Sequence, residues 1–175
     1  MTKRVTLRPV TPRDLPIFFA QQAEPEANRM AAFPARAQKA FSAHWTKILN
    51  DDTVIIKTIL CAGRVAGHIV SWEQGGAREV GYWIGRSYWG QGIASAALSQ
   101  FLEIVTVRPL HAHVARHNIA SQRVLQKCGF VITGEGAFRD ADGEQGEEFL
   151  LTLGAHDCGQ ASLRVNRQDS PRPTP

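Results

Sequence analysis

The segment 82–95, YWIGRSYWGQGIAS, most constrains how this chain can fold, because an aromatic, apolar strand pattern runs through a glycine-spaced turn directly into a helical pattern. Such a junction directs several backbone N–H groups and the positive end of a helix dipole toward one place. These are the elements of a phosphate-binding site. Gly90 and Gly92 also fit an ordinary tight turn, so the segment alone does not identify a ligand.

Strand and helix patterns alternate along the rest of the chain. Strands are predicted at 5–8, 53–60, 65–72, 79–84, 110–115, 129–132 and 148–153, and helices at 11–22, 24–30, 34–49, 94–105 and 118–128. This order predicts an α/β (α+β) fold with a single mixed, mostly antiparallel central sheet of about seven strands, flanked by helices.

Length and composition indicate one folded domain, residues 1–154, followed by a disordered C-terminal tail, 155–175, that ends in PRPTP. The net charge of +4 comes from scattered arginines, so no nucleic-acid stripe is expected. No signal peptide or membrane span is visible. The odd number of cysteines, Cys61, Cys128 and Cys158, argues against a disulfide framework. We expect a cytoplasmic monomer or homodimer that binds neither nucleic acid nor membrane.

Three phosphate-binding patterns compete for the glycine turn. A nucleotide P-loop needs a lysine and a serine or threonine after its glycines, and neither is present. A dinucleotide fingerprint needs a third glycine, where this chain has Ser95, and an acidic residue about 20 positions later, which the segment 111–116 lacks. The third pattern is a loop that binds the pyrophosphate of coenzyme A.

Two spaced motifs favour the third pattern. Residues 89–94, WGQGIA, resemble the Q/R-x-x-G-x-G/A loop of the GNAT superfamily of acyl-CoA N-acyltransferases, with Trp89 in place of the usual Gln or Arg. Residues 118–130, NIASQRVLQKCGF, resemble the family's N-x-x-S/A…K-x-G-F motif. The resemblance covers about residues 5–153 and is greatest for the branch with ribosomal-protein N-terminal acetyltransferases (RimJ/RimL type).

This resemblance implies an N-acetyltransferase that moves an acetyl group from acetyl-CoA to a primary amine by direct transfer in a ternary complex. The amine is a protein N-terminus or a small molecule such as a polyamine, an amino sugar or an amino acid. The alternative is a non-catalytic acyl-CoA-binding sensor on the same fold. In the family the N-terminal helices, here about 24–33, and the loop before the last strand, here 139–148, form the acceptor side.

The resemblance also implies site residues. Asn118 would contact the pantetheine arm, and a backbone N–H near Trp83 or Ile84 would hold the oxyanion. The complete set expected at the cofactor is Trp83, Ile84, Trp89, Gly90, Gln91, Gly92, Ile93, Ala94, Ser95, Asn118, Ser121 and Lys127.

Acyl transfer to an amine also needs a group that accepts the amine's proton. The resemblance places Glu79 there, acting through water, although an exposed strand-end carboxylate beside Arg78 is an equal alternative. The family's general acid is a tyrosine seven residues after the Asn, and this chain has Leu125 there. Ser121, one turn nearer the helix start on the same face, is the candidate donor to the departing sulfur, with helix capping as its alternative.

Histidines and acidic residues offer further candidates. His111 and His113 share one strand face, but no cysteine or carboxylate is adjacent, so we expect polar edge histidines and no metal site. The segment 139–148 carries Asp140, Asp142, Glu144, Glu147 and Glu148. These carboxylates predict either an acidic acceptor rim or, more simply, a solvated hairpin tip.

Overall fold

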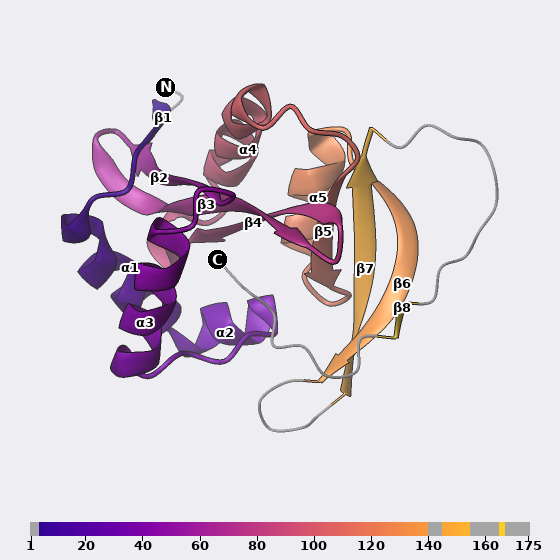
Figure 1. The fold of residues 1–175 in the computed structure, drawn as a ribbon, viewed down its shortest axis with the longest axis horizontal. Helices are drawn as coiled ribbons and strands as arrows, with labels where there is room; N and C mark the ends of the chain where they lie inside the picture. Colours follow the sequence, from indigo (N-terminus) through magenta and orange to yellow (C-terminus); the bar gives the residue numbers. More distant parts are fainter. Residues whose placement is uncertain (1–3, 140–144, 155–164, 167–175) are drawn as a thin grey trace.

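The computed structural model describes residues 4–139, 145–154 and 165–166, and these form one sheet with helices on both faces (Figure 1). The elements are β1 (Val5–Arg8), η1 (Pro12–Asp14), α1 (Leu15–Gln22), α2 (Pro25–Ala31), α3 (Gln38–Leu49), β2 (Ile55–Cys61), β3 (Arg64–Gln74), β4 (Ala77–Ile84), η2 (Arg86–Tyr88), α4 (Ile93–Ile104), β5 (Leu110–Ala115), α5 (Ile119–Lys127), β6 (Val131–Arg139), β7 (Gln145–Leu153) and β8 (Val165–Asn166).

The strands lie in the order β1-β2-β3-β4-β5-β7-β6-β8. The pairs β4–β5 and β6–β8 are parallel, and the other pairs are antiparallel. The predicted mixed, mostly antiparallel sheet is therefore confirmed. The described residues contain one strand more than the seven expected, because residues 165–166 form β8. The other residues of the expected tail, 155–164 and 167–175, lie outside the described residues, as does the predicted turn at 140–143.

Element bounds differ from the sequence prediction where a side chain overrides the local pattern. The helix predicted from residue 34 begins only at Gln38. The Gln22 amide both donates to the Arg36 carbonyl (3.0 Å) and accepts from the Arg36 N–H (3.3 Å). Because these bonds use the backbone groups of Arg36, residues before α3 stay out of the helix.

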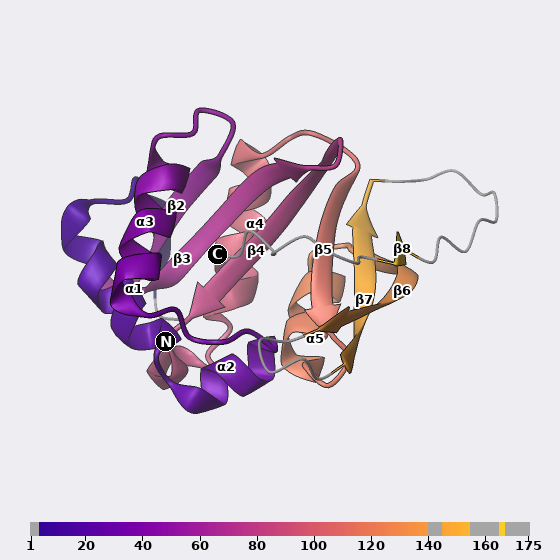
Figure 2. The same ribbon diagram turned by 60° about the horizontal axis from the view of Figure 1, so that its bottom comes forward.

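Helices α1 and α3 lie on one face of the sheet and α4 and α5 on the other (Figure 2). An apolar cluster packs on each face. The larger one lies under α4 and α5 and includes Leu98, Phe101 and Leu125. The smaller one lies under α1 and α3, where Phe18 stacks on Trp45 at a centroid distance of 4.9 Å. Side chains alternate between faces along a strand. In β4 the even-numbered residues therefore face α4 and α5, and the odd-numbered ones face α1 to α3.

The centre of the sheet is divided. The parallel ladder between β4 and β5 comprises only the pairs Arg78↔Leu110 and Glu79↔His111. Beyond Glu79, β4 stays paired with β3 as far as Ile84, and β5 stays paired with β7 as far as Ala115. The two strands part, and the gap between them, which we call the splay, opens a route across the sheet.

A buried ion pair joins the first strand to the helices that follow it. Asp14 is 2% exposed and accepts two hydrogen bonds from the Arg8 guanidinium (2.6 and 2.7 Å). The Thr11 N–H (2.9 Å) and the Thr58 hydroxyl (2.8 Å) also donate to it. Burial raises the pKa of Asp14, but these donors more than offset burial and hold the pKa well below its usual range.

We expect Asp14→Asn to lower the free energy of unfolding by roughly 2 kcal/mol near neutral pH, because the buried side chain loses its charge-assisted hydrogen bonds with the half-buried Arg8 guanidinium. A carboxyl with a depressed pKa contributes stability above its unfolded pKa of about 3.9, and this contribution is lost as pH falls through the folded pKa. Urea unfolding at pH 7 and pH 3 should therefore show a gap between wild type and variant that narrows at pH 3. An equal gap at both pH values would contradict this account.

Candidate active site

The glycine turn after β4 forms the cradle that the sequence predicts. Gly90 (φ +70°) and Gly92 (φ +73°) both adopt left-handed backbone, and a Cβ on either would meet nothing within 4 Å. The first helical hydrogen bond of α4 runs from the Ala96 N–H to the Gly92 carbonyl (3.1 Å). The N–H groups of residues 93–95 have no acceptor within the helix. The turn therefore offers open backbone donors to an anion.

Trp89 has a structural role at the position where the motif usually has Gln or Arg. Its indole Nε1 donates to the Ile84 carbonyl at 2.8 Å. The Gln91 amide donates to the Ser87 carbonyl at 2.9 Å. The first bond ties the turn to the last residue of β4 and the second ties it to η2, so side chains of the turn itself hold the cradle in shape.

A cavity of about 420 Å³ lies over this turn. Eleven of the twelve residues expected at the cofactor line it, and Lys127, exposed in the last turn of α5, does not appear in its lining. The lining also contains Arg123, Tyr88 and Met30, which the sequence analysis did not single out.

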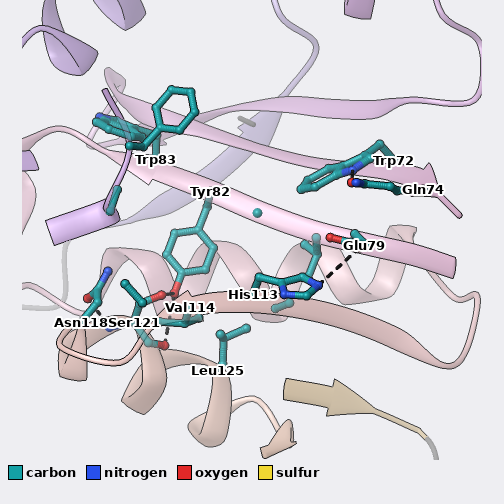
Figure 3. A pocket seen from close by; sticks show the side chains of 16 residues that line it. Trp72, Gln74, Glu79, Tyr82, Trp83, His113, Val114, Asn118, Ser121 and Leu125 are labelled. Carbon is teal, nitrogen blue, oxygen red and sulfur yellow. Dashed lines mark hydrogen bonds and ion pairs between the residues drawn. The ribbon is translucent and has the colours of Figure 1, made fainter. Parts of the chain in front are cut away.

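A second cavity, of about 110 Å³, lies on the other side of the splay and is lined by Glu79, His113, Trp72 and Phe33 among others (Figure 3). The two cavities share lining residues at their junction: Ala31, Tyr82, Trp83, Asn118 and Ser121. The splay therefore connects the phosphate cradle to a pocket that contains a buried carboxylate.

Glu79 is buried, with 3% exposure, and is not the exposed strand-end group that was its alternative. One oxygen lies 3.5 Å from Nε2 of His113, and the other ring nitrogen of His113 lies 3.1 Å from a carboxylate oxygen of Glu148 on β7. Burial lowers the pKa of His113, but hydrogen bonds and charges of the two glutamates outweigh burial and raise it. Glu79, His113 and Glu148 thus form a coupled acid–base row.

Two expectations about these residues are wrong. The histidines are not edge residues, because β5 lies between β4 and β7 inside the sheet. His111 also has a partner, with Nδ1 2.9 Å from the Thr152 hydroxyl. Glu148 is not at a solvated hairpin tip, since it is 5% exposed and faces His113. Glu147 is exposed and pairs with Arg116 (2.9 Å), while residues 140–144 of the acidic segment lie outside the described residues.

Ser121 and Asn118 lie on the opposite side of the splay. The Asn118 side chain caps α5 by accepting from the Ser121 N–H (3.1 Å). The Ser121 hydroxyl does not cap the helix, because it lies 2.7 Å from the phenol oxygen of Tyr82 (Figure 3). Leu125 is 1% exposed and fills the position of the family's tyrosine with an apolar side chain.

Helix α2 lies over the splay and covers it. Glu26 on α2 pairs with Arg86, which follows β4, and the Arg29 carbonyl lies 2.7 Å from Nε2 of His117, which follows β5. The helix is thus attached beyond both parted strands. Within residues 4–139 and 145–154 no three or more His, Cys, Asp or Glu side chains, the row of Glu79, His113 and Glu148 included, are arranged so that they could hold a metal ion. No helix in these residues is long and apolar enough to cross a membrane.

The sequence model of a protein family, described as acetyltransferase (GNAT) domain, matches residues 4–131 of the chain. The chain belongs to the GNAT acetyltransferase family. As a GNAT domain it is an acyl-CoA-dependent N-acyltransferase with acetyl-CoA as co-substrate, and the glycine cradle fits the pyrophosphate of that substrate. A curated relative, the uncharacterized N-acetyltransferase p20 of Bacillus licheniformis, is 23% identical over 159 residues, which cover 83% of this chain and 88% of the relative.

Solved structures share the GNAT fold. A spermidine N-acetyltransferase from Vibrio cholerae, in complex with CoA and spermine, has a TM-score of 0.72 and 17% identity, covering 85% of this chain and 94% of that one. RimJ of Mycobacterium smegmatis, in complex with CoA-disulfide, has a TM-score of 0.72 and 21% identity, and the match covers 91% of this chain and 86% of that one. At these identities the likeness concerns the fold, and it includes the RimJ-type branch that the motifs indicated.

Two glycines at positive φ, one in the cradle and one in a hairpin outside it, provide a matched pair of variants. An L-residue at positive φ costs about 1 kcal/mol, so Gly92→Ala and Gly75→Ala (φ +58°, in the β3–β4 hairpin) should destabilise the protein similarly. We expect only Gly92→Ala to weaken CoA binding, by about tenfold or 1.4 kcal/mol, because Gly92 lines the cavity over the cradle and Gly75 does not. Calorimetric titration with CoA measures this difference. Equal CoA affinity of the two variants would show that the phosphates bind elsewhere.

Proposed function

We propose that this GNAT domain acetylates a primary amine by direct transfer, with acetyl-CoA and the amine bound together on opposite sides of the splay. The observation that carries the proposal is the junction of the two cavities. One contains the phosphate cradle and the other contains Glu79, and they meet at Tyr82, Trp83 and Ser121. A thioester extending from the cradle can reach the carboxylate pocket through this junction.

Glu79 is the proposed general base. The attacking nitrogen forms a bond to the thioester carbon, the bond from that carbon to sulfur breaks, and the electron pair of the broken bond leaves with the sulfur. The proton that the nitrogen releases passes to Glu79, through water where the amine is not in direct contact. His113 and Glu148 lie behind Glu79 and share the added proton, since the carboxylates stabilise an imidazolium between them.

The amine is expected to be small or to project a narrow end into the pocket, which has a volume of about 110 Å³. The ring of Trp72 and that of Phe33, which lies edge-on to Trp83 at 6.4 Å, give the pocket aromatic walls. Carboxylates and aromatic faces both attract cations. We therefore place polyamines, amino sugars, amino acids and short peptides with free N-termini in the first set of acceptors to test.

The test is release of free thiol from acetyl-CoA in the presence of each amine, with CoA affinity measured in parallel. We expect Glu79→Gln to lower kcat by about a hundredfold to ten-thousandfold with CoA affinity unchanged, because only proton acceptance is lost. Binding of acetyl-CoA without thiol release for any amine would favour the sensor and overturn the proposal. A kcat for Glu79→Gln equal to that of the wild type would show that Glu79 is not the general base.

The pH dependence tests the coupled row. His113 must be neutral for the row to take another proton, so the rate should fall as pH drops through the raised pKa of His113. Glu79 on β4 and Glu148 on β7 are the charged groups that raise this pKa, and His113 in turn lowers the pKa of His111 on the same strand. Glu148→Gln removes one carboxylate that raises this pKa, so the acidic limb of the rate profile should move to lower pH.

The control for this measurement is Glu147→Gln, which removes the neighbouring exposed carboxylate paired with Arg116. We expect no movement of the acidic limb in this variant. A limb that moves equally in both variants, or that moves to higher pH in Glu148→Gln, would refute the assignment of the profile to His113.

A further inference from the structure

The Tyr82 phenol is a half-buried polar group that the mechanism above leaves unused. Tyr82 lies in β4 beyond the last pair with β5, and its side chain crosses the splay to α5 (Figure 3). Its phenol oxygen lies 2.7 Å from Oγ of Ser121 and 3.4 Å from the Ser121 carbonyl oxygen. The Ser121 N–H is already bonded to Asn118. Ser121 is therefore fixed at both its backbone and its hydroxyl.

The hydroxyl groups of Tyr82 and Ser121 lie where the thioester must pass in the proposed mechanism. Tyr82 and Ser121 line both cavities, and the phosphate cradle and Glu79 lie on opposite sides of them. The amine proton leaves toward Glu79, so the sulfur departs on the other side, toward α5. At position 125 of that helix the side chain is leucine and offers no donor.

The Tyr82 phenol keeps a proton that it can donate, and in its 2.7 Å contact with Oγ of Ser121 either hydroxyl can be the donor. Burial raises the pKa of Tyr82 and outweighs the opposing effect of the Ser121 hydrogen bond, so the phenol stays neutral and keeps its proton. Its nearest acceptor is Oγ of Ser121. When the phenol donates there, the Ser121 hydrogen is free to point to another acceptor in the junction. A hydroxyl that accepts one hydrogen bond also becomes a stronger donor.

We propose that Tyr82 is a positioning residue, whose phenol donates to Ser121 and directs the Ser121 hydroxyl at the sulfur of the departing coenzyme A. The inference rests on the proposed function, since it assigns the second half of the same transfer. As the C–S bond breaks, the electron pair moves to sulfur, and the Ser121 O–H hydrogen bond stabilises the thiolate. No proton leaves Ser121 or Tyr82, and the thiolate takes its proton from water after release.

The test compares two leaving groups in single-turnover measurements, with acetyl-CoA and its selenium analogue, the acetyl selenoester of CoA, as substrates. A selenolate is a more stable leaving group than a thiolate and needs less help. We expect Tyr82→Phe to slow transfer from the thioester by about tenfold to a hundredfold, which is less than the roughly hundredfold to thousandfold lost with a donor that touches the reacting atoms, because Tyr82 acts through Ser121. With the selenoester the loss should shrink to less than about threefold.

A double-mutant cycle tests whether Tyr82 acts through Ser121. Ser121→Ala should slow the thioester reaction by about a hundredfold, and adding Tyr82→Phe should change this by less than about twofold. Thr133→Val is the matched control, because it removes a similar hydroxyl pair, 2.6 Å between Thr133 and Thr152, away from the splay. Thr133→Val should leave the rates of transfer from both esters unchanged.

The outcomes separate this inference from the proposed function. A wild-type protein that transfers from neither ester would overturn both. If the wild type is active and Tyr82→Phe slows transfer from both esters by the same factor, the substitution has caused a structural defect. If the rate losses of Tyr82→Phe and Ser121→Ala multiply in the double variant, the two residues act independently. Either result overturns the positioning role alone. CoA affinity, measured by calorimetry, should be the same in Tyr82→Phe and wild type.

Discussion

The early end of the ladder between β4 and β5 is the constraint on which the site depends. Each strand keeps its full pairing on its outer side, with β3 or β7, so parting them leaves only the facing edges without a strand partner. Unpaired buried backbone groups are costly unless a side chain, water or substrate satisfies them. The gap is therefore flanked on one face by α2 and on the other by α5, and the remaining space is the junction between the two cavities.

Because the gap crosses the sheet, the two kinds of chemistry are separated by the alternation of side chains along β4. Glu79 faces the side of α1 to α3 and meets His113, while Tyr82 faces α5 and meets Ser121. In the proposed mechanism, proton acceptance and stabilisation of the leaving group would therefore come from opposite faces. His113, whose pKa is raised, would then lie on the side of the amine and away from the departing sulfur.

The sequence was most informative where function depends on local backbone. The glycine turn at Gly90 and Gly92 and the helix that begins at residue 119 are set by residues close in sequence, and both were predicted. The row of Glu79, His113 and Glu148 was not, since it joins three strands distant in the chain. It depends on β7 lying between β5 and β6, a strand order that the order of elements in the sequence does not determine. That order also places His113 inside the sheet.

Relatives with 17% to 21% identity share this fold at a TM-score of 0.72, which shows how few positions the architecture fixes. A phosphate cradle requires glycine at positive φ and free N–H groups, and few side chains can substitute for that backbone. A hydrogen-bond donor, in contrast, can reach the same point in the splay from either β4 or α5. Leu125 is therefore compatible with transfer, because Tyr82 places a phenol against Ser121 from the opposite strand.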